Sequence, residues 1–176
     1  CKHTNYMHAL KTYAELKKWF MIKVANRYSF REQEQLFFLV LFFLKRWSKA
    51  EYSMHRHYLV EEYYFKHYIS IIEQLNLGKP IQHILGFTSF FEMDLKVNKH
   101  TLIPRPETEE LVFNLLEEIN PKDEINLIDI GTGSGCISLA LKKKRELINA
   151  IGIDVSDEAL KVAKYNAEKL NLDVQF

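Results

Sequence analysis

The sequence predicts an α/β protein in which a small amino-terminal helical bundle precedes a short parallel sheet. Neither Gly nor Pro occurs before Gly78, so long helices are expected in that part of the chain. After residue 120, short apolar runs rich in branched residues are typical of buried parallel strands. Between these parts, residues 78–106 combine Gly, Pro and an alternating apolar pattern, which indicates a connector with a β-hairpin.

Charge and aromatic residues are distributed unevenly along the 176 residues, although the net charge is only +1. Residues 1–78 hold 12 Lys and Arg against 7 Asp and Glu, and residues 79–176 hold 12 against 16. Of the 23 aromatic residues, 17 precede residue 79. Two different modules are the simplest explanation. We therefore expect a helical domain over 1–77, the connector over 78–106, and a sheet domain over 107–176.

The composition also bears on the cellular compartment in which the protein is expected. The only cysteines are Cys1 and Cys136, so no disulfide framework is predicted, and the chain suits the reducing cytoplasm. The longest unbroken apolar run, Leu36 to Leu44, has nine residues and is too short to span a bilayer. No secretory signal is visible. The small net charge provides no global field for nucleic acid.

Helical periodicity divides the amino-terminal module into three expected helices: Met7 to Val24, Arg31 to Trp47, and His57 to Leu75. The run from Leu36 to Leu44 is apolar on every side, so the second helix is expected to be the buried centre of the bundle. Gly78 is expected to end the third helix as a C-terminal cap, because Pro80 follows.

The composition of this module raises two other possible functions. His55, His57 and His67 could suggest a metal, but they lack the tight spacing of a ligand set, and no metal is expected. The excess of Lys and Arg could bind nucleic acid, form a solvated basic face, or dock a protein partner. The solvated face is the simplest of these interpretations, and direct binding of nucleic acid is not expected.

The connector shows two strand signals and a proline-flanked arginine. Phe91 to Val97 alternates with period two, and Thr101 to Ile103 follows as a second short strand, so a hairpin is predicted between them. Pro104 and Pro106 hold Arg105 in an extended segment. A helix is expected to begin near Glu107, because several acids there suit the positive end of its dipole.

The most informative stretch follows the first expected strand of the sheet domain, Ile125 to Ile130. Three glycines occur at alternate positions, 131, 133 and 135, and a helix is predicted from Cys136. A strand, a glycine turn and a helix N-terminus let a nucleotide-like ligand approach the backbone closely. The order is GxGxG, and Cys136 stands where a dinucleotide fingerprint needs its third glycine. No Lys-Ser/Thr pair follows, so a Walker phosphate-binding loop is excluded.

A second strand, Ala150 to Asp154, ends in an acid. An acid at the carboxyl end of the neighbouring strand is placed to accept hydrogen bonds from the two ribose hydroxyls of an adenosine. Together with the glycine turn it favours S-adenosylmethionine over NAD, since there is no pyrophosphate to bind. The alternative is that the glycines only make a tight turn. Ser156 is expected to cap a helix that runs to about Leu170, and a third strand is expected from Asp173.

Four segments together resemble the HemK family of protein glutamine N5-methyltransferases: Ile84-Leu-Gly86, Ile103-Pro-Arg-Pro-Glu-Thr-Glu109, Asp129-Ile-Gly-Thr-Gly-Ser-Gly135, and Asp154. The resemblance implies that a helical substrate-recognition domain precedes a Rossmann-like class I methyltransferase domain. It also implies that S-adenosylmethionine is the methyl donor. The substrate would be the glutamine in the Gly-Gly-Gln loop of a peptide chain release factor.

The resemblance also assigns residues. The cofactor-binding residues that it implies are Asp129, Gly131, Thr132, Gly133, Ser134, Gly135, Asp154 and Arg105. The family's catalytic Asn-Pro-Pro-Tyr sequence does not occur in residues 1–176, so no catalytic residue is assigned. We therefore expect an amino-terminal piece of a longer protein, with a truncated sheet domain, an exposed strand edge and no activity of its own.

Two alternatives remain open at this point. Asn-Pro-Pro-Tyr enzymes also include nucleic-acid methyltransferases, so the substrate could be a nucleic acid. The chain could also be a non-catalytic protein-binding module in which the glycine turn is only structural.

Overall fold

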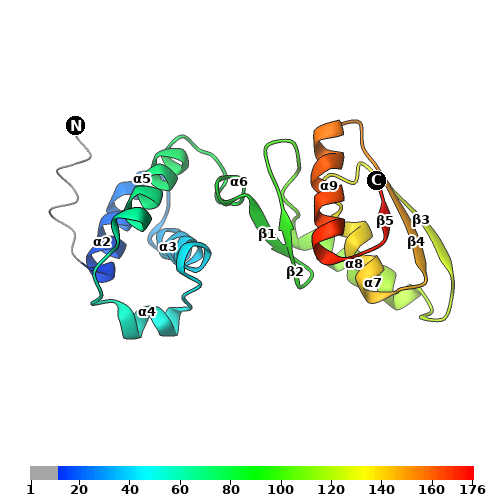
Figure 1. Ribbon diagram of the computed structural model, residues 1–176, viewed down its shortest axis with the longest axis horizontal. Coiled ribbons are helices and arrows are strands. Elements are labelled where there is room, and N and C mark those ends of the chain that lie inside the picture. Colours follow the sequence, from blue (N-terminus) through cyan, green and yellow to red (C-terminus); the bar gives the residue numbers. More distant parts are fainter. Residues whose placement is uncertain (1–11) are drawn as a thin grey trace. The chain divides into compact units, whose positions relative to one another are not determined.

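The computed structural model describes residues 12–176, which divide into two compact units (Figure 1). The first unit ends at Leu85 and the second begins at Gly86. The connector expected over 78–106 is thus shared between them, and its hairpin belongs to the unit that contains the sheet. Within residues 12–176, no helix is long and apolar enough to cross a bilayer.

The helical unit contains α2 (Tyr13–Val24), α3 (Phe30–Lys45), α4 (Lys49–His55), α5 (Glu62–Asn76) and α6 (Ile81–Leu85). Three of these helices begin at a capping box, in which a hydroxyl residue and a glutamate three positions later satisfy each other's backbone amides. The pairs are Thr12 with Glu15, Ser29 with Glu32, and Ser48 with Glu51. The chain itself therefore specifies where α2, α3 and α4 start.

The third expected helix, His57 to Leu75, is confirmed over most of its length as α5, which begins at Glu62 and ends at Asn76. Helix α4, which begins at the Ser48 capping box, was not predicted, and residues 56–61 connect it to α5. Within this connection an isolated bridge joins Leu59 to Thr12. The first part of the helix expected from Met7 lies outside the described residues.

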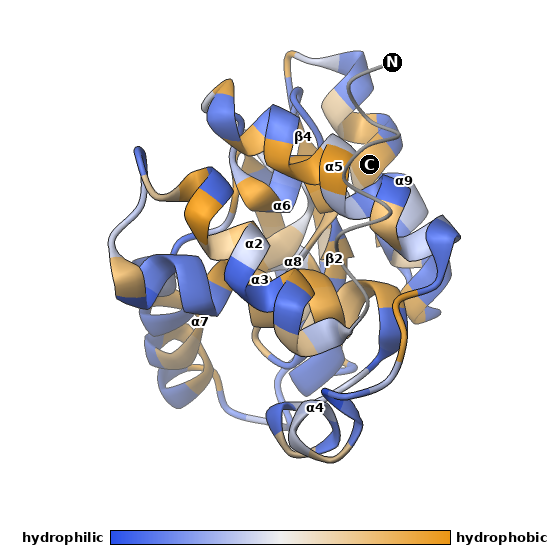
Figure 2. Cartoon of the chain, turned by 90° about the vertical axis from the view of Figure 1, so that its left-hand side faces the viewer, coloured by the Kyte–Doolittle hydropathy of each residue, from blue (hydrophilic) through white to orange (hydrophobic). Residues whose placement is uncertain are grey.

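The core of the helical unit is aromatic, and α3 contributes to it on one side only. The ring of Phe37 lies 5.7 Å from that of Phe20 and 5.8 Å from that of Tyr68, measured between centroids. All three side chains are fully buried, whereas Phe42 on α3 is 43% exposed. The expectation that α3 is buried on every side is therefore wrong. Figure 2 shows both hydrophobic and hydrophilic stretches on α5, as in an amphipathic helix.

The second unit begins with an antiparallel hairpin of β1 (Phe87–Phe90) and β2 (Met93–Lys96). Its turn consists of Phe91 and Glu92, both with positive φ, of 47° and 59°. The hairpin expected in the connector is confirmed, but its pairing differs: the turn falls within the strand expected over Phe91 to Val97, and residues 101–103 form no strand. Neither turn residue is the Gly or Asn that usually marks such a turn, so the position of the turn has no signal in the sequence.

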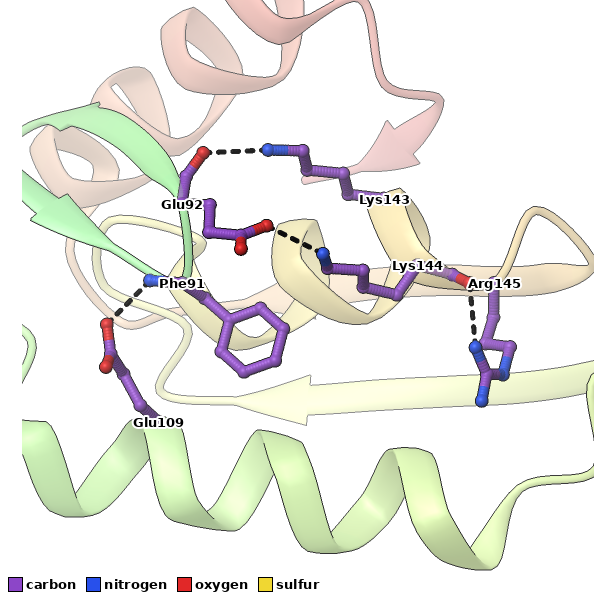
Figure 3. A network of polar contacts seen from close by, with 6 residues as sticks. All are labelled: Phe91, Glu92, Glu109, Lys143, Lys144 and Arg145. Atoms are coloured by element: carbon purple, nitrogen blue, oxygen red, sulfur yellow. Dashed lines mark hydrogen bonds and ion pairs between the residues drawn. The ribbon is translucent and has the colours of Figure 1, made fainter.

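Side chains of two helices fix this strained turn (Figure 3). The backbone N–H of Phe91 donates to Oε1 of Glu109 at 2.6 Å, from helix α7 (Pro106–Glu118). Lys143 Nζ donates to the carbonyl oxygen of Glu92 at 2.8 Å, and Lys144 Nζ donates to its carboxylate at 2.8 Å. The hydrogen bond from Lys144 lowers the pKa of Glu92. These contacts hold the hairpin on the remainder of the unit.

The sheet consists of three parallel strands in the order β3 (Ile125–Ile130), β4 (Ile148–Ile153) and β5 (Val174–Gln175). Helices α8 (Cys136–Lys144) and α9 (Asp157–Leu170) connect them, as βαβ units require. In the register, Asp129 lies opposite Gly152. A Cβ added at Gly152 would lie 2.5 Å from Cε1 of Phe176, so the ring of Phe176 occupies the space that a side chain there would need.

Residues 12–176 cover only one face of this sheet. The core cluster joins residues of α7, α8 and α9 and of the hairpin with Ile148, Ala150 and Val174 of the strands. The alternate strand residues point the other way and stay exposed: Ile128 is 64% and Ile130 80% exposed. In Figure 1, α8 and α9 lie on the same side of β3 and β4. Strand β3 is also an edge of the sheet, as predicted.

Candidate functional site

The glycine turn, residues 131–135, connects the end of β3 to the start of α8. Its three glycines have φ values of 75°, 56° and 79°, in the left-handed region that other residues avoid. Gly135 is also the N-cap residue of α8, and a Cβ there would lie 2.9 Å from Cζ of Phe176 and 3.1 Å from Cδ1 of Leu139. Both conformation and space therefore require glycine at this position.

Asp129 fixes the turn from the strand below it. Its Oδ2 accepts hydrogen bonds from Oγ1 of Thr132 at 2.7 Å and from Oγ of Ser138 at 2.5 Å. Thr132 is 4% exposed and Ser134 1% exposed. The side chains of these two turn residues are therefore directed into the protein, and only their backbone groups remain for a ligand. Sequence reasoning did not identify Ser138, although its position one turn into α8 suits such a contact.

Asp154, at the carboxyl end of β4, lies against the glycine turn. Its Oδ2 accepts the backbone N–H of Gly133 at 2.9 Å, and its Oδ1 accepts that of Ser156 at 2.9 Å. The backbone N–H groups of Gly131 and Thr132 both donate to the carbonyl oxygen of Ile153, at 2.8 and 3.0 Å. The structure therefore brings the acid and the turn together at one edge of the sheet. Each carboxylate oxygen keeps a lone pair for another donor.

A cavity of about 310 Å³ opens at this edge, at the carboxyl ends of β3 and β4. Its lining consists of Ile130, Gly131, Ile153, Asp154 and Val155. Four of these five residues provide only apolar atoms or backbone, and the carboxylate of Asp154 is the one charged group among them. Such a site can hold an apolar ring and accept hydrogen bonds from neighbouring hydroxyl groups.

Arg105 is not joined to this edge by hydrogen bonds. It is the N-cap residue of α7, has an extended backbone and is exposed. Across residues 12–176, no hydrogen bond or ion pair involves its guanidinium, so the structure assigns it no contact with the glycine turn. The acids that follow it suit the start of α7, where Glu107 and Glu109 lie in the first turn.

Cys136 is the first residue of α8 and packs against the core cluster of the sheet unit. Burial raises the pKa of its thiol from 9.0 to about 11. A thiol with so high a pKa stays protonated at neutral pH and is a poor nucleophile. The thiol beside the glycine turn is therefore a packing group and takes no covalent role.

Asn166 of α9 also belongs to the site, and sequence reasoning did not identify it. It is fully buried, and its side-chain amide donates to the carbonyl oxygen of Ser134 at 2.9 Å. The signal available in the sequence was weak: Asn166 falls on the same face of the predicted helix as Ala163 and Ala167. A polar residue on an apolar helix face needs a buried partner, but the sequence does not say which one.

The sequence was compared with known proteins. The family described as "Methyltransferase domain" matches residues 121–176. A release factor glutamine methyltransferase from Staphylococcus aureus is 37% identical over 131 residues, which cover 74% of this chain and 46% of that protein. A protein of the same name from Flavobacterium psychrophilum is 36% identical over 160 residues, covering 89% of this chain and 56% of that protein.

A third relative of that name, from Streptococcus pneumoniae, is 48% identical over 104 residues, or 59% of this chain and 37% of that protein. The chain thus spans about half the length of the curated relatives that it matches. These identities confirm the resemblance carried by the four sequence segments. The chain is similar to the release factor glutamine methyltransferases, and the part of its second unit from residue 121 onward matches a methyltransferase domain.

Proposed function

We propose that this protein binds S-adenosylmethionine and takes part in methylating the glutamine side chain in the Gly-Gly-Gln loop of a peptide chain release factor. The names of the relatives support the reaction and its protein substrate. The residues of the sheet unit support the cofactor. The helical unit would recognise the release factor, and the reaction would take place in the cytoplasm, which suits a chain without a disulfide framework.

The observation that carries the cofactor assignment is the position of Asp154 against the glycine turn. A carboxylate held by two backbone N–H groups is fixed in place while it retains acceptor capacity for two hydroxyls. A ribose presents such a pair of hydroxyls. The apolar side chains of Ile130, Ile153 and Val155 provide a surface for the adenine ring. The residues present therefore fit the adenosine part of S-adenosylmethionine.

The protein's contribution to catalysis would be positioning. Bound S-adenosylmethionine supplies an electrophilic methyl group to a neutral amide. The glycine turn and Asp154 orient the adenosine by hydrogen bonds, and the apolar cavity walls keep water from it. Holding two reactants in a productive geometry can lower a barrier by several kcal/mol, on the order of 7–11 for ideal cases.

Asp154→Ala tests the cofactor assignment by calorimetric titration of the natural protein with S-adenosylmethionine. We expect a loss of about 1.5–3 kcal/mol in binding free energy, the value of hydrogen bonds to a charged group. Asp157→Ala removes an acid of the same size from the first turn of α9 and is the matched control, with unchanged affinity expected. Equal affinity of the Asp154 variant and the unmodified protein would refute the ribose-acceptor role.

A second experiment tests the substrate. The natural protein is incubated with methyl-labelled S-adenosylmethionine and a purified release factor. We expect label on the release factor and none on a variant whose Gly-Gly-Gln glutamine is replaced by glutamate. Label on nucleic acid and not on the release factor would replace this proposal by the nucleic-acid alternative.

A further inference from the structure

We propose that Asn166 is a positioning residue that locks the glycine turn onto the hairpin and thereby sets the shape of the cofactor site. This inference rests on the proposed function for its ligand, but its geometry is independent of that function. Asn166 lies on α9 and does not line the cavity at the ends of β3 and β4. Its effect on a ligand must therefore act through the turn.

The side-chain amide of Asn166 makes three hydrogen bonds. Its Nδ2 donates to the carbonyl oxygen of Ser134 at 2.9 Å and to that of Lys96 at 3.0 Å. Its Oδ1 accepts the backbone N–H of Lys96 at 2.7 Å. An asparagine amide has two donors, and both are satisfied here, together with one acceptor. Because Asn166 is 0% exposed, no water can take over these contacts without a rearrangement.

The two partners lie in different parts of the unit. Lys96 is the last residue of β2, and both of its backbone polar groups bond to this one side chain, as they would to a neighbouring strand. Ser134 is the fourth residue of the glycine turn and lies 32 residues from Asn166, whereas Lys96 is 70 residues away. One side chain thus connects the hairpin, the turn and α9.

The hydrogen bond from Asn166 to the carbonyl oxygen of Ser134 orients the whole peptide group between Ser134 and Gly135. A peptide group is planar, so holding the carbonyl oxygen of Ser134 also sets the direction of the N–H of Gly135. That N–H donates to the carbonyl oxygen of Thr132 at 2.8 Å and closes the turn. Three glycines make this segment intrinsically adaptable. We infer that without Asn166 the Ser134–Gly135 peptide can rotate, and that the turn then samples shapes that do not fit the ligand.

The test separates this positioning role from ordinary packing. Asn166→Ala removes all three hydrogen bonds. Val162→Ala is the matched control, because Val162 lies one helical turn earlier, is 4% exposed and packs without a hydrogen-bonding side chain. Two measurements are made on each variant of the natural protein: hydrogen exchange of the Gly135 amide, which needs no ligand, and affinity for S-adenosylmethionine.

We expect Asn166→Ala to accelerate exchange at Gly135 and to weaken S-adenosylmethionine, each by about tenfold beyond the control, as for local opening after loss of a buried hydrogen bond. Exchange at Gly135 no faster than in Val162→Ala would overturn the proposal. Faster exchange with unchanged affinity would also overturn it, because the shape of the turn would then not matter to the ligand.

Failure of the proposed function gives a different result. If the unmodified protein does not bind S-adenosylmethionine, the cofactor assignment falls, and the link between Asn166 and a ligand falls with it, whatever the exchange rates are. If Asn166→Ala does not fold, Asn166→Asp replaces it, since its carboxylate still accepts from Lys96 but cannot donate to Ser134. Lowering the pH should then partly restore the protection of the Gly135 amide, measured as its exchange rate relative to the intrinsic rate at the same pH, because a protonated carboxyl regains one donor. No gain in protection at low pH would count against the proposal.

Discussion

The two faces of the three-stranded sheet carry the same kind of residue but have opposite surroundings. On the covered face, Ile148 is 1% and Ala150 4% exposed, while on the open face of the same strand Ile151 is 43% and Ile153 47% exposed. Parallel strands are normally covered on both faces and are therefore apolar on both. The difference arises because α7, α8 and α9 pack on a single side. Apolar residues therefore occur on both faces of these strands, as in sheets that are covered on both sides. Which of them are buried depends on where the neighbouring helices pack.

The largest expected effect is a loss of packing on the covered face. Leu139 of α8 is fully buried in the core cluster, so Leu139→Ala should lower the free energy of unfolding by about 2–5 kcal/mol. Urea denaturation measures this. Leu147→Ala, at a position 44% exposed, is the control and should cost far less. Similar losses in the two variants would remove the contrast between covered and exposed apolar positions.

The reactivity of Cys136 tests the covered face without changing its packing. Because folding raises the pKa of this thiol from 9.0 to about 11, the thiolate fraction at pH 8 falls about hundredfold. In a Cys1→Ser background, iodoacetamide should therefore label Cys136 at least that much more slowly in the folded protein than in urea. The folded rate should keep rising up to about pH 11, whereas the unfolded rate levels off near 9.

The raised pKa of Cys136 also makes the stability of the folded protein depend on pH. Folding favours the neutral thiol, so this contribution to stability is complete below the unfolded pKa of 9.0 and is lost as the pH rises through about 11. Rapid labelling of the folded protein at pH 8, at a rate near that of the unfolded chain, would show that the covered face does not shield the residue.

The smallest effect is expected on the open face. Ile128 is 64% exposed, so Ile128→Thr keeps a branched side chain in β3 and should change stability by no more than about 0.5 kcal/mol. Ile148→Thr makes the same change on the covered face and should cost considerably more. A large loss in the Ile128 variant, accompanied by a change in elution volume, would mean that association covers the open face in solution.

The fold could be predicted best where neighbouring residues in the sequence specify the local structure by themselves. Strand β3 has the predicted bounds, Ile125–Ile130, and the glycine turn and α8 follow it where expected. The position of the hairpin turn could not be predicted, because Phe91 and Glu92 adopt positive φ without being turn residues by type. Contacts with Glu109, Lys143 and Lys144 hold them there, and such contacts exist only after α7 and α8 have packed.

Some residues of the candidate site could likewise be predicted from local signals, and others could not. The glycine turn and Asp154 could be predicted because each lies at the end of a strand, and parallel strands bring such ends together. Asn166 could not be predicted, because its role depends on partners 32 and 70 residues away. For Thr132 and Ser134, the sequence suggested contact with a ligand, but the structure buries both side chains within the site.

The contact between Gly152 and Phe176 has a consequence for how this domain can diverge. A Cβ at position 152 would meet the ring of Phe176 at 2.5 Å and Oγ1 of Thr132 at 2.7 Å. The ring also fills the space beside Gly135, so a single aromatic side chain shares its volume with two glycines on different segments. Substitutions at positions 135, 152 and 176 therefore affect one another. A larger residue at 152 is compatible with the domain only if the side chains at both 176 and 132 move or become smaller.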